Sequence, residues 1–394
     1  MYWTKDQIER AYQNARGLRE QIHCQPELGH HEFRTSQLIS NFLLLHNIEL
    51  IPLGSKTGVV GYIRGRYPGK ILALREDIDA LPIQENTGLP FASQIGGVSH
   101  ACGHDIHTAA LMGCAQLLIS QRDCMHGSVL LIFQCAEETF DGAATMLEHG
   151  LFCSGYPDAI VGFHCSPDLP LGSVGVLSGI ADASCDMITL RILGKSGHGA
   201  YPYRAVDPVL IGAGLLMQLQ TVITRNNCAT DPAVLTFGEF HAGTAPNIIP
   251  GEAVLRGNLR TFDNDVRKKL LGKIDQISQG YCAAMGARVE TIIERDMPPL
   301  INSSDISKQI IKSVRTILGE DAVTISLKPS LGSDDFSCLL EKCGGHGVQY
   351  LLGTAVKDDP KTSLGLHVAE NVFPSEALLP GILSLSQFAM DYLR

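Results

Sequence analysis

The stretch from Ser99 to Ala109 is unusually rich in side chains that can bind a metal ion. Its letters, SHACGHDIHTA, include one thiol, three imidazoles and one carboxylate. Burying such groups is costly unless each one is paired or coordinates an ion. Cys102 and His104 are two residues apart, so on an extended segment both side chains point to the same side. A lone Cys or His is more often an ordinary buried residue, so a metal site needs further ligands from elsewhere in the chain.

The further candidate ligands follow short hydrophobic runs that have the composition of buried strands. A pair of glutamates follows the run 129–133, and histidines follow the runs 159–163 and 348–352. Polar groups that collect past the carboxyl ends of strands mark the ligand sites of open α/β sheets. The ligands that we expect to converge there are Cys102, His104, Glu138, His164 and His367.

This ligand set predicts a pair of divalent ions and a hydrolytic reaction. Thiolate, imidazole and carboxylate together suit Zn, and a larger share of carboxylate favours Mn. Five ligands exceed one tetrahedral site, whereas two ions that share a bridging ligand account for the number. Glu137 stands beside Glu138, so one carboxylate can bind an ion while the other faces the water on that ion. Such a carboxylate takes a proton from the water and later gives it to a leaving amine.

The rest of the sequence predicts an α/β chain in two parts. Helical periodicity covers residues 4–46 with a break at Pro26, and strand-like runs follow. From about residue 183 the order of elements is β-α-β-β-α-β, which is typical of a small ferredoxin-like unit. We expect a catalytic domain with a mixed open sheet flanked by helices, residues 1–182 and 293–394, and an inserted α+β lid and dimerisation domain, residues 183–292.

Composition argues against several classes of partner. The chain has 394 residues and a net charge of −10, and it lacks the Lys/Arg clusters that bind nucleic acid. No apolar run reaches the ~18 residues of a membrane span, and the first residues lack the pattern of a signal peptide. The twelve cysteines form no CxxC pair. We therefore expect reduced thiols in a cytoplasmic protein that has neither nucleic-acid nor membrane partners.

Motifs spread along the chain carry a resemblance to a known family. They are His23 with 26-PELG-29, 77-DIDALP-82, 100-HACGHD-105, 136-AEE-138, 162-GFH-164, 197-GHGA-200, 243-GTAPNIIP-250, 333-SDDF-336 and 366-LH-367. In this combination the chain resembles the aminoacylase/carboxypeptidase family of di-metal peptidases. Within that family it is most similar to the subgroup of hippurate hydrolases, N-acyl-L-amino-acid amidohydrolases and indole-acetyl-amino-acid hydrolases.

The resemblance implies a binuclear metal site and a role for each of its residues. Cys102 bridges or joins two divalent ions held with the other four ligands, with Mn or Zn expected first and Ni or Co as alternatives. Glu137 is the general base and acid. The implied substrate is an N-acyl-L-amino acid, cleaved at its amide bond into a carboxylic acid and a free amino acid after attack by a metal-bound hydroxide.

The resemblance also assigns residues outside the ligand set. His198 in the lid polarises the scissile carbonyl, and Asn247 and Arg260 grip the substrate carboxylate, for which an Arg fork is well suited. Asp77 and Asp79 support the site by orienting imidazoles. The lid commonly forms the dimer contact in this family, so we expect a homodimer, with a tetramer as the alternative.

Other functions compete with this interpretation. The same site in a metallo-dipeptidase or carboxypeptidase would act on short peptides. Cys102 could instead be a covalent nucleophile, and a non-catalytic binding homologue is a further alternative. The sequence departs from the subgroup pattern without losing a ligand, and we expect Glu76 and the loop at Phe140 to shift substrate choice. The departures are Glu76, Cys135, Thr139-Phe140-Asp141 and Asp334.

Overall fold

The computed structural model of the protein describes residues 2–153 and 155–394. The chain folds into two compact units. Unit 1 comprises Met1–Gly179, Ile301–Lys328 and Asp335–Arg394, and unit 2 comprises Ile180–Leu300 and Pro329–Asp334. The predicted domain boundaries differ from these units in three places. Residues 180–182, 293–300 and 329–334 group with unit 2. A strand of unit 2 continues to Met297, and the Ala183 N–H donates to the carbonyl oxygens of Ser330 and Gly332.

Unit 1 is built on an eight-stranded mixed sheet with the order β1-β2-β4-β3-β5-β16-β6-β15. The central strands β4, β3, β5 and β16 run parallel to one another. They are hydrophobic and buried along most of their length, as strands covered on both faces are. This arrangement confirms the predicted mixed open sheet. The strands are β1 (Glu49–Ile51), β2 (Val59–Arg64), β3 (Tyr67–Asp77), β4 (His126–Gln134), β5 (Ala159–Pro170), β6 (Val174–Gly175), β15 (Val323–Thr324) and β16 (Gly347–Ala355).

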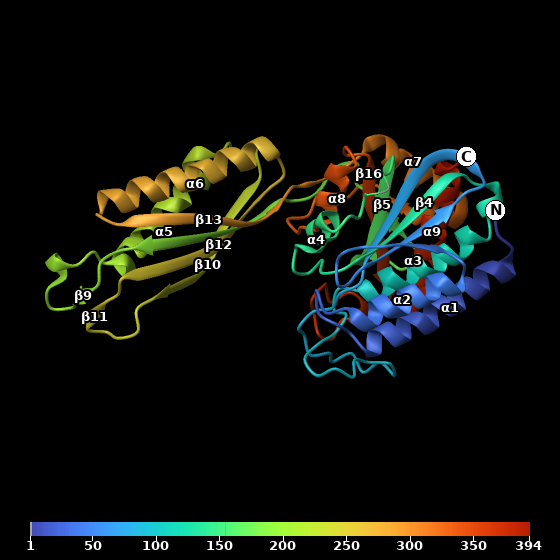
Figure 1. Ribbon diagram of the computed structural model, residues 1–394, viewed down its shortest axis with the longest axis horizontal. Coiled ribbons are helices and arrows are strands. Elements are labelled where there is room, and N and C mark those ends of the chain that lie inside the picture. Colours follow the sequence, from blue (N-terminus) through green and yellow to red (C-terminus); the bar gives the residue numbers. More distant parts are fainter. Residues whose placement is uncertain (1, 154) are drawn as a thin grey trace. The chain divides into compact units, whose positions relative to one another are not determined.

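Helices cover both faces of this sheet (Figure 1). Leu72 and Leu74 of β3 join one core with α1, α3, α7 and α9. Arg75 alternates to the other face, where its guanidinium lies over the ring of Phe336 in α8. No helix in the described residues combines the length and the apolar character that crossing a membrane requires. The helices are α1 (Lys5–Cys24), α2 (Phe33–Leu45), α3 (His104–Ile119), α4 (Gly142–Glu148), α7 (Ser304–Leu318), α8 (Phe336–Lys342) and α9 (Leu378–Tyr392).

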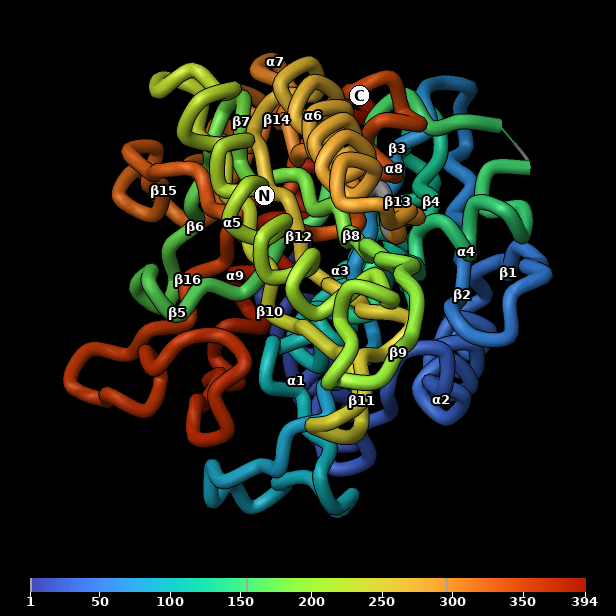
Figure 2. The backbone as a smooth tube through the Cα atoms, turned by 90° about the vertical axis from the view of Figure 1, so that its left-hand side faces the viewer, coloured from blue at the N-terminus to red at the C-terminus, as the bar shows by residue number. Residues whose placement is uncertain are grey.

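Unit 2 is a four-stranded antiparallel sheet with two helices packed against it (Figures 1 and 2). Its strand order, β10-β12-β8-β13, is that of a β-α-β-β-α-β ferredoxin-like unit, so this prediction is confirmed. A short pair, β9 (Gly197–His198) and β11 (Ile248–Ile249), extends from it. The other elements are β8 (Cys185–Leu193), α5 (Pro208–Asn226), β10 (Ala233–Ala242), β12 (Glu252–Thr261), α6 (Asn264–Ala284) and β13 (Arg288–Met297), with β7 (Gly179–Asp182) and β14 (Leu300–Asn302) at the chain passages between the units.

One strand end differs from the prediction. His164 was expected to follow its strand, whereas β5 continues to Pro170 and contains it. The reason is that β16 keeps pairing with β5 beyond the hydrophobic run, as far as Pro170 opposite Ala355. The side chain of His164 is therefore directed by the pleat of a strand and not by a loop.

Candidate metal centre

The structure brings the five predicted ligands together within unit 1. Cys102, His104 and His164 offer ligand atoms within 4.8 Å of one another, and so do Cys102, Glu138 and His367. The Cys102 Sγ lies 3.4 Å from the His164 Nε2, and the Glu138 Oε1 lies 3.4 Å from the His367 Nε2. Cys102 belongs to both groups, as a bridging ligand would. The role of these residues as ligands stays a prediction.

The start of α3 is shaped so that Cys102 and His104 stand side by side. Gly103 separates them with φ of 88°, a left-handed conformation that residues with a Cβ rarely adopt. A Cβ at Gly103 would also come within 3.2 Å of the Cys165 Cβ. The turn therefore requires glycine for two independent reasons.

Hydrogen bonds leave one nitrogen of two imidazoles free to face an ion. The His104 Nδ1 lies 3.0 Å from the Asp79 carbonyl oxygen and 3.2 Å from Asp79 Oδ1, so this nitrogen carries the proton and donates it. The His164 Nδ1 donates in the same way to the Cys165 carbonyl oxygen at 2.8 Å. The Nε2 atom of each ring is thus the one that can offer a lone pair to an ion, which is the usual arrangement of metal-binding histidines. This geometry agrees with the orienting role predicted for Asp79.

The electrostatics of the site favour positive charge. Burial lowers the pKa of His104, but Asp77, Asp79 and Glu138 outweigh burial and raise the pKa to about 10. Burial, together with Glu138 and nearby carboxylates, holds the pKa of the Cys102 thiol well above its usual range. A thiolate here therefore needs cations beside it. The His104 Nε2 is buried without a hydrogen-bond partner in the described part of the chain, and it lies 3.7 Å from the Glu138 Oε1, so the donor set fits two divalent ions.

His107 is a buried residue of this centre that was not predicted from the sequence. Its Nδ1 lies 2.6 Å from Asp77 Oδ1, and its Nε2 accepts the Cys165 N–H at 2.9 Å. Asp77, His104 and His107 lie close enough together to suggest a group of metal ligands. Both nitrogens of His107 are engaged in hydrogen bonds, however, so we interpret His107 as a residue that orients Asp77. Burial lowers the pKa of His107 to about 4, which keeps the ring neutral. The sequence feature that could have identified His107 is its position three residues after His104, which places both side chains on the same face of a helix.

Arg75 is a second supporting residue that was not predicted from the sequence. Its side chain is fully buried and donates to Asp77 Oδ2 at 2.9 Å, to Gln134 Oε1 at 2.8 Å and to Asp335 Oδ1 at 3.2 Å. Asp77 is thereby held between a guanidinium and an imidazole. Burial opposes the charge on Asp77, but His104, His107 and Arg75 together lower the pKa of Asp77 well below its usual range.

The loop that carries His367 is tied to the start of α3. The His367 N–H donates to the Ala101 carbonyl oxygen at 2.9 Å. Arg19 of α1, also fully buried, donates to Asp105 of α3 at 2.7 Å and to the Phe373 carbonyl oxygen at 2.6 Å. These contacts fix the spacing between ligands that are far apart in the sequence.

Glu137 lies at the edge of the ligand cluster. Its side chain is about 5% exposed, and its Oε2 lies 3.9 Å from the His104 Nε2. The N–H of the next residue, Glu138, donates to Asp79 Oδ2 at 2.9 Å. Of the departures from the subgroup pattern, Glu76 is fully buried and accepts the Phe163 N–H at 3.0 Å, so it ties β3 to β5.

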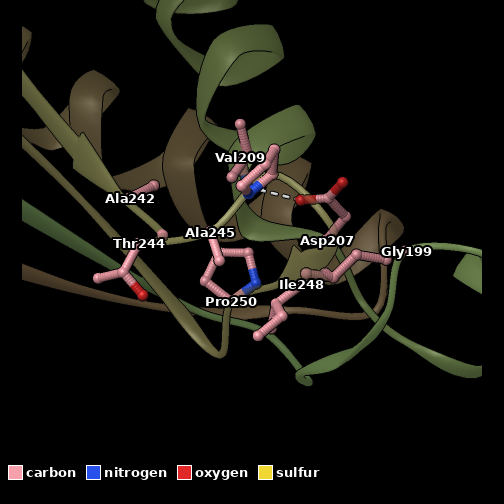
Figure 3. A pocket seen from close by; sticks show the side chains of 11 residues that line it. Gly199, Asp207, Val209, Ala242, Thr244, Ala245, Ile248 and Pro250 are labelled. Atoms are coloured by element: carbon pink, nitrogen blue, oxygen red, sulfur yellow. Dashed lines mark hydrogen bonds between the residues drawn. The ribbon is translucent and has the colours of Figure 1, made fainter.

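The predicted substrate-binding residues of unit 2 lie in two places. His198 is paired with Ile248, and the Gly199 N–H donates to the Asn247 carbonyl oxygen at 2.9 Å, so His198 and Asn247 are neighbours. A cavity of about 480 Å³ lies beside them, lined by Gly199, Asp207, Ile248 and others (Figure 3).

Arg260 lies near the other end of β12. At about 3.3 Å per residue, the stretch from Glu252 to Arg260 spans roughly 26 Å. Arg260 Nη1 donates to the Leu331 carbonyl oxygen at 2.6 Å and to Ser333 Oγ at 3.3 Å. The structure therefore does not bring Arg260 together with His198 and Asn247 within unit 2.

Comparisons with known proteins identify the family of this chain. The sequence model of peptidase family M20/M25/M40 matches residues 73–389. The chain is 37% identical to an N-acetyl-L-cysteine deacetylase of Bacillus subtilis, over 84% of this chain and 78% of that protein. It is 35% identical to thermostable carboxypeptidase 1 of Saccharolobus solfataricus, over 93% of this chain and 94% of that protein. The YXEP protein of Bacillus subtilis, described as a dinuclear metal binding peptidase of the M20 family, superposes with a TM-score of 0.81 at 32% identity, over 98% of this chain and 99% of that one. The chain belongs to peptidase family M20/M25/M40.

Proposed function

We propose that this protein is a metal-dependent amidohydrolase that cleaves N-acyl-L-amino acids into a carboxylic acid and a free amino acid. The observation that carries the proposal is the pair of ligand groups that share Cys102, with the carboxylate of Glu137 beside them. A relative named for the deacetylation of N-acetyl-L-cysteine, itself an N-acyl amino acid, supports this substrate class.

Two divalent ions are proposed as the cofactor, Mn or Zn in the first place and Ni or Co as alternatives. Cys102, His104 and His164 would hold one ion, and Cys102, Glu138 and His367 the other. Such ions lower the pKa of a water molecule and polarise a carbonyl group.

The protein's own residues supply the proton transfer and the orientation of the substrate. Glu137 accepts a proton from the attacking water and delivers it to the leaving nitrogen. Asp79 holds both the His104 ring and the backbone N–H of Glu138, so one carboxylate fixes a ligand and the turn that carries the base. His198 is proposed to polarise the carbonyl, and Asn247 and Arg260 to bind the substrate carboxylate.

A hydrolysis screen tests the substrate class. The protein is stripped of metal, reloaded separately with Mn, Zn, Co or Ni, and offered N-acetyl, N-benzoyl and indole-acetyl amino acids beside dipeptides. We expect at least one N-acyl series to exceed the dipeptides in kcat/KM by about 10-fold or more, since a site that fits one group can reject another by that factor. A preference for peptides would instead favour the second candidate, a carboxypeptidase, which the name of one relative suggests.

We propose that unit 2 is a lid and that two copies of the chain associate through it. The stretch of β12 from Glu252 to Arg260 alone spans roughly 26 Å, and His198 and Asn247 lie at the β9–β11 pair, which precedes the Glu252 end of that strand. One small substrate cannot contact both ends of a single unit 2, so all three predicted contacts require a second copy. The solvent face of α5 carries Leu210 and Met217, 63% and 69% exposed and seven residues apart. An uncharged, apolar helix face of this kind is typical of an interface.

Replacing Met217 with Asp is therefore expected to weaken self-association. A charge in a buried apolar contact costs an interface on the order of 2 kcal/mol or more, which corresponds to at least about 30-fold in the dimer dissociation constant. Sedimentation equilibrium measures the change, and circular dichroism checks the fold. Lys273→Asp on α6 is the control and leaves the constant unchanged. A wild-type protein that is monomeric at micromolar concentration would contradict the proposal.

A further inference from the structure

The turn that carries Glu137 is held in a conformation that it would not adopt alone. Ala136 and Phe140, on either side of the two glutamates, have φ of 54° and 60°. Left-handed backbone is unfavourable for residues with a Cβ and persists only where the surroundings enforce it. Inside the turn, the Phe140 N–H donates to the Glu137 carbonyl oxygen at 2.7 Å. The position of the Glu137 carboxylate therefore depends on whatever keeps Ala136 in place.

Two buried carboxylates hold the backbone on either side of Glu137. Glu32 Oε1 accepts the Ala136 N–H at 2.7 Å, and Asp79 Oδ2 accepts the Glu138 N–H at 2.9 Å. Both carboxylates are at most 1% exposed, so water cannot replace them as acceptors. Asp79 also contacts the candidate ligand His104, whereas Glu32 bonds to the turn and to Thr57.

The carboxylate of Glu32 does not cap the helix that it precedes. Glu32 is the N-cap residue of α2, a place where an acidic side chain usually accepts N–H groups of its own helix, yet it makes no such bond. Glu27 does so instead, because its carboxylate accepts the N–H groups of Arg34 and Thr35 at 3.0 and 2.9 Å. Glu32 instead accepts the backbone N–H of Ala136, a residue 104 positions away in the sequence.

We propose that Glu32 is a positioning residue for the proton carrier Glu137. The inference rests on the proposed function, in which Glu137 moves the proton. Without the Glu32 acceptor, Ala136 relaxes from its left-handed conformation and the Glu137 carboxylate shifts. Misplacing a reacting group by about 1 Å costs on the order of 100-fold in rate. Glu32 bonds to no candidate ligand, and the Glu138 N–H keeps its acceptor on Asp79, so we expect the loss in kcat and not in KM or in metal content.

The test compares Glu32→Met, which removes the acceptor at nearly constant length, with Glu32→Gln, which keeps an acceptor oxygen. We expect Glu32→Met to lower kcat by about 10- to 100-fold with two ions still bound and KM unchanged, and Glu32→Gln to stay closer to the wild type. Glu27→Ala is the matched control at the same helix end, and it lowers the melting temperature without lowering kcat. Should Glu32→Met not fold, Glu32→Ala takes its place with the same expected loss.

A second variant separates positioning from a purely structural role. Ala136→Gly removes the penalty for left-handed backbone, so adding it to Glu32→Met is expected to restore part of the lost kcat. The proposal is overturned if Glu32→Met lowers only the melting temperature, or if kcat falls equally with and without glycine at 136. If Glu137→Gln is inactive while Glu32→Met matches the wild type, this inference alone fails. Full activity of Glu137→Gln would instead refute the proposed function.

Discussion

Replacing Glu137 with Gln is expected to lower kcat by about 1,000-fold or more while both ions stay bound. General acid–base catalysis is worth roughly 100- to 10,000-fold, and an amide of the same size cannot accept the proton. Glu137 is only about 5% exposed, so bulk water cannot easily substitute for it. Steady-state kinetics measure the loss, and elemental analysis of the dialysed protein measures the bound metal.

The matched control for this variant lies on the same turn. The Asp141 side chain is 47% exposed and bonds to His30 at 2.8 Å. Asp141→Asn therefore changes a carboxylate of the turn without touching the ligand cluster and is expected to keep kcat. Substantial turnover in Glu137→Gln would mean that another group carries the proton.

Replacing Cys102 with Ala is expected to disrupt both metal sites at once. Cys102 is the common member of the two ligand groups, whereas His164 belongs to one of them. We therefore expect Cys102→Ala to lose high affinity for both ions and nearly all turnover, and His164→Ala to lose affinity for one. Calorimetric titration of the metal-free protein measures stoichiometry and affinity independently of activity. Because ligands that bind only the folded state stabilise it, added metal should raise the melting temperature of the wild type and much less that of Cys102→Ala.

Cys165→Ala is the control for this second prediction. Its thiol is buried near Gly103 but belongs to neither ligand group, so metal stoichiometry stays at two. Two tightly bound ions in Cys102→Ala would exclude Cys102 as a shared ligand. The alternative of a covalent nucleophile makes a different prediction, since an acyl-thioester would then accumulate on Cys102.

The sequence was sufficient to predict which residues gather in the ligand cluster because each candidate follows a recognisable hydrophobic run or opens a buried helix, although β5 itself continues beyond His164. Hydrophobic runs predict β4, β5 and β16, and the parallel pairing of β5 with β16 brings the residues that follow them to one region. The helical spacing of the apolar residues Leu111, Cys114, Ala115 and Leu118 predicts a buried helix directly after the polar stretch, which is α3. Spacing and strand order therefore determine most of the site.

The supporting residues could not be predicted because their roles depend on burial. An Arg is almost never fully buried unless it is paired, and nothing near Arg19 or Arg75 in the sequence identifies the partners Asp105 and Asp335. Backbone conformation is equally hidden, since Ala136 has no sequence feature that indicates a positive φ. The contact from Glu32 to Ala136 becomes visible only when α2 and the turn are placed side by side.

The route of the chain through unit 2 limits how that unit can be isolated. The polypeptide changes units four times, after Gly179, Leu300, Lys328 and Asp334. The short return segment supplies carbonyl oxygens that accept the Ala183 N–H and the Arg260 guanidinium. A recombinant fragment ending at residue 300 would leave these donors without their acceptors, because it would lack the segment 329–334 that packs against them. Unit 2 can be excised intact only if residues 329–334 are grafted onto it, for example through a circularly permuted linker.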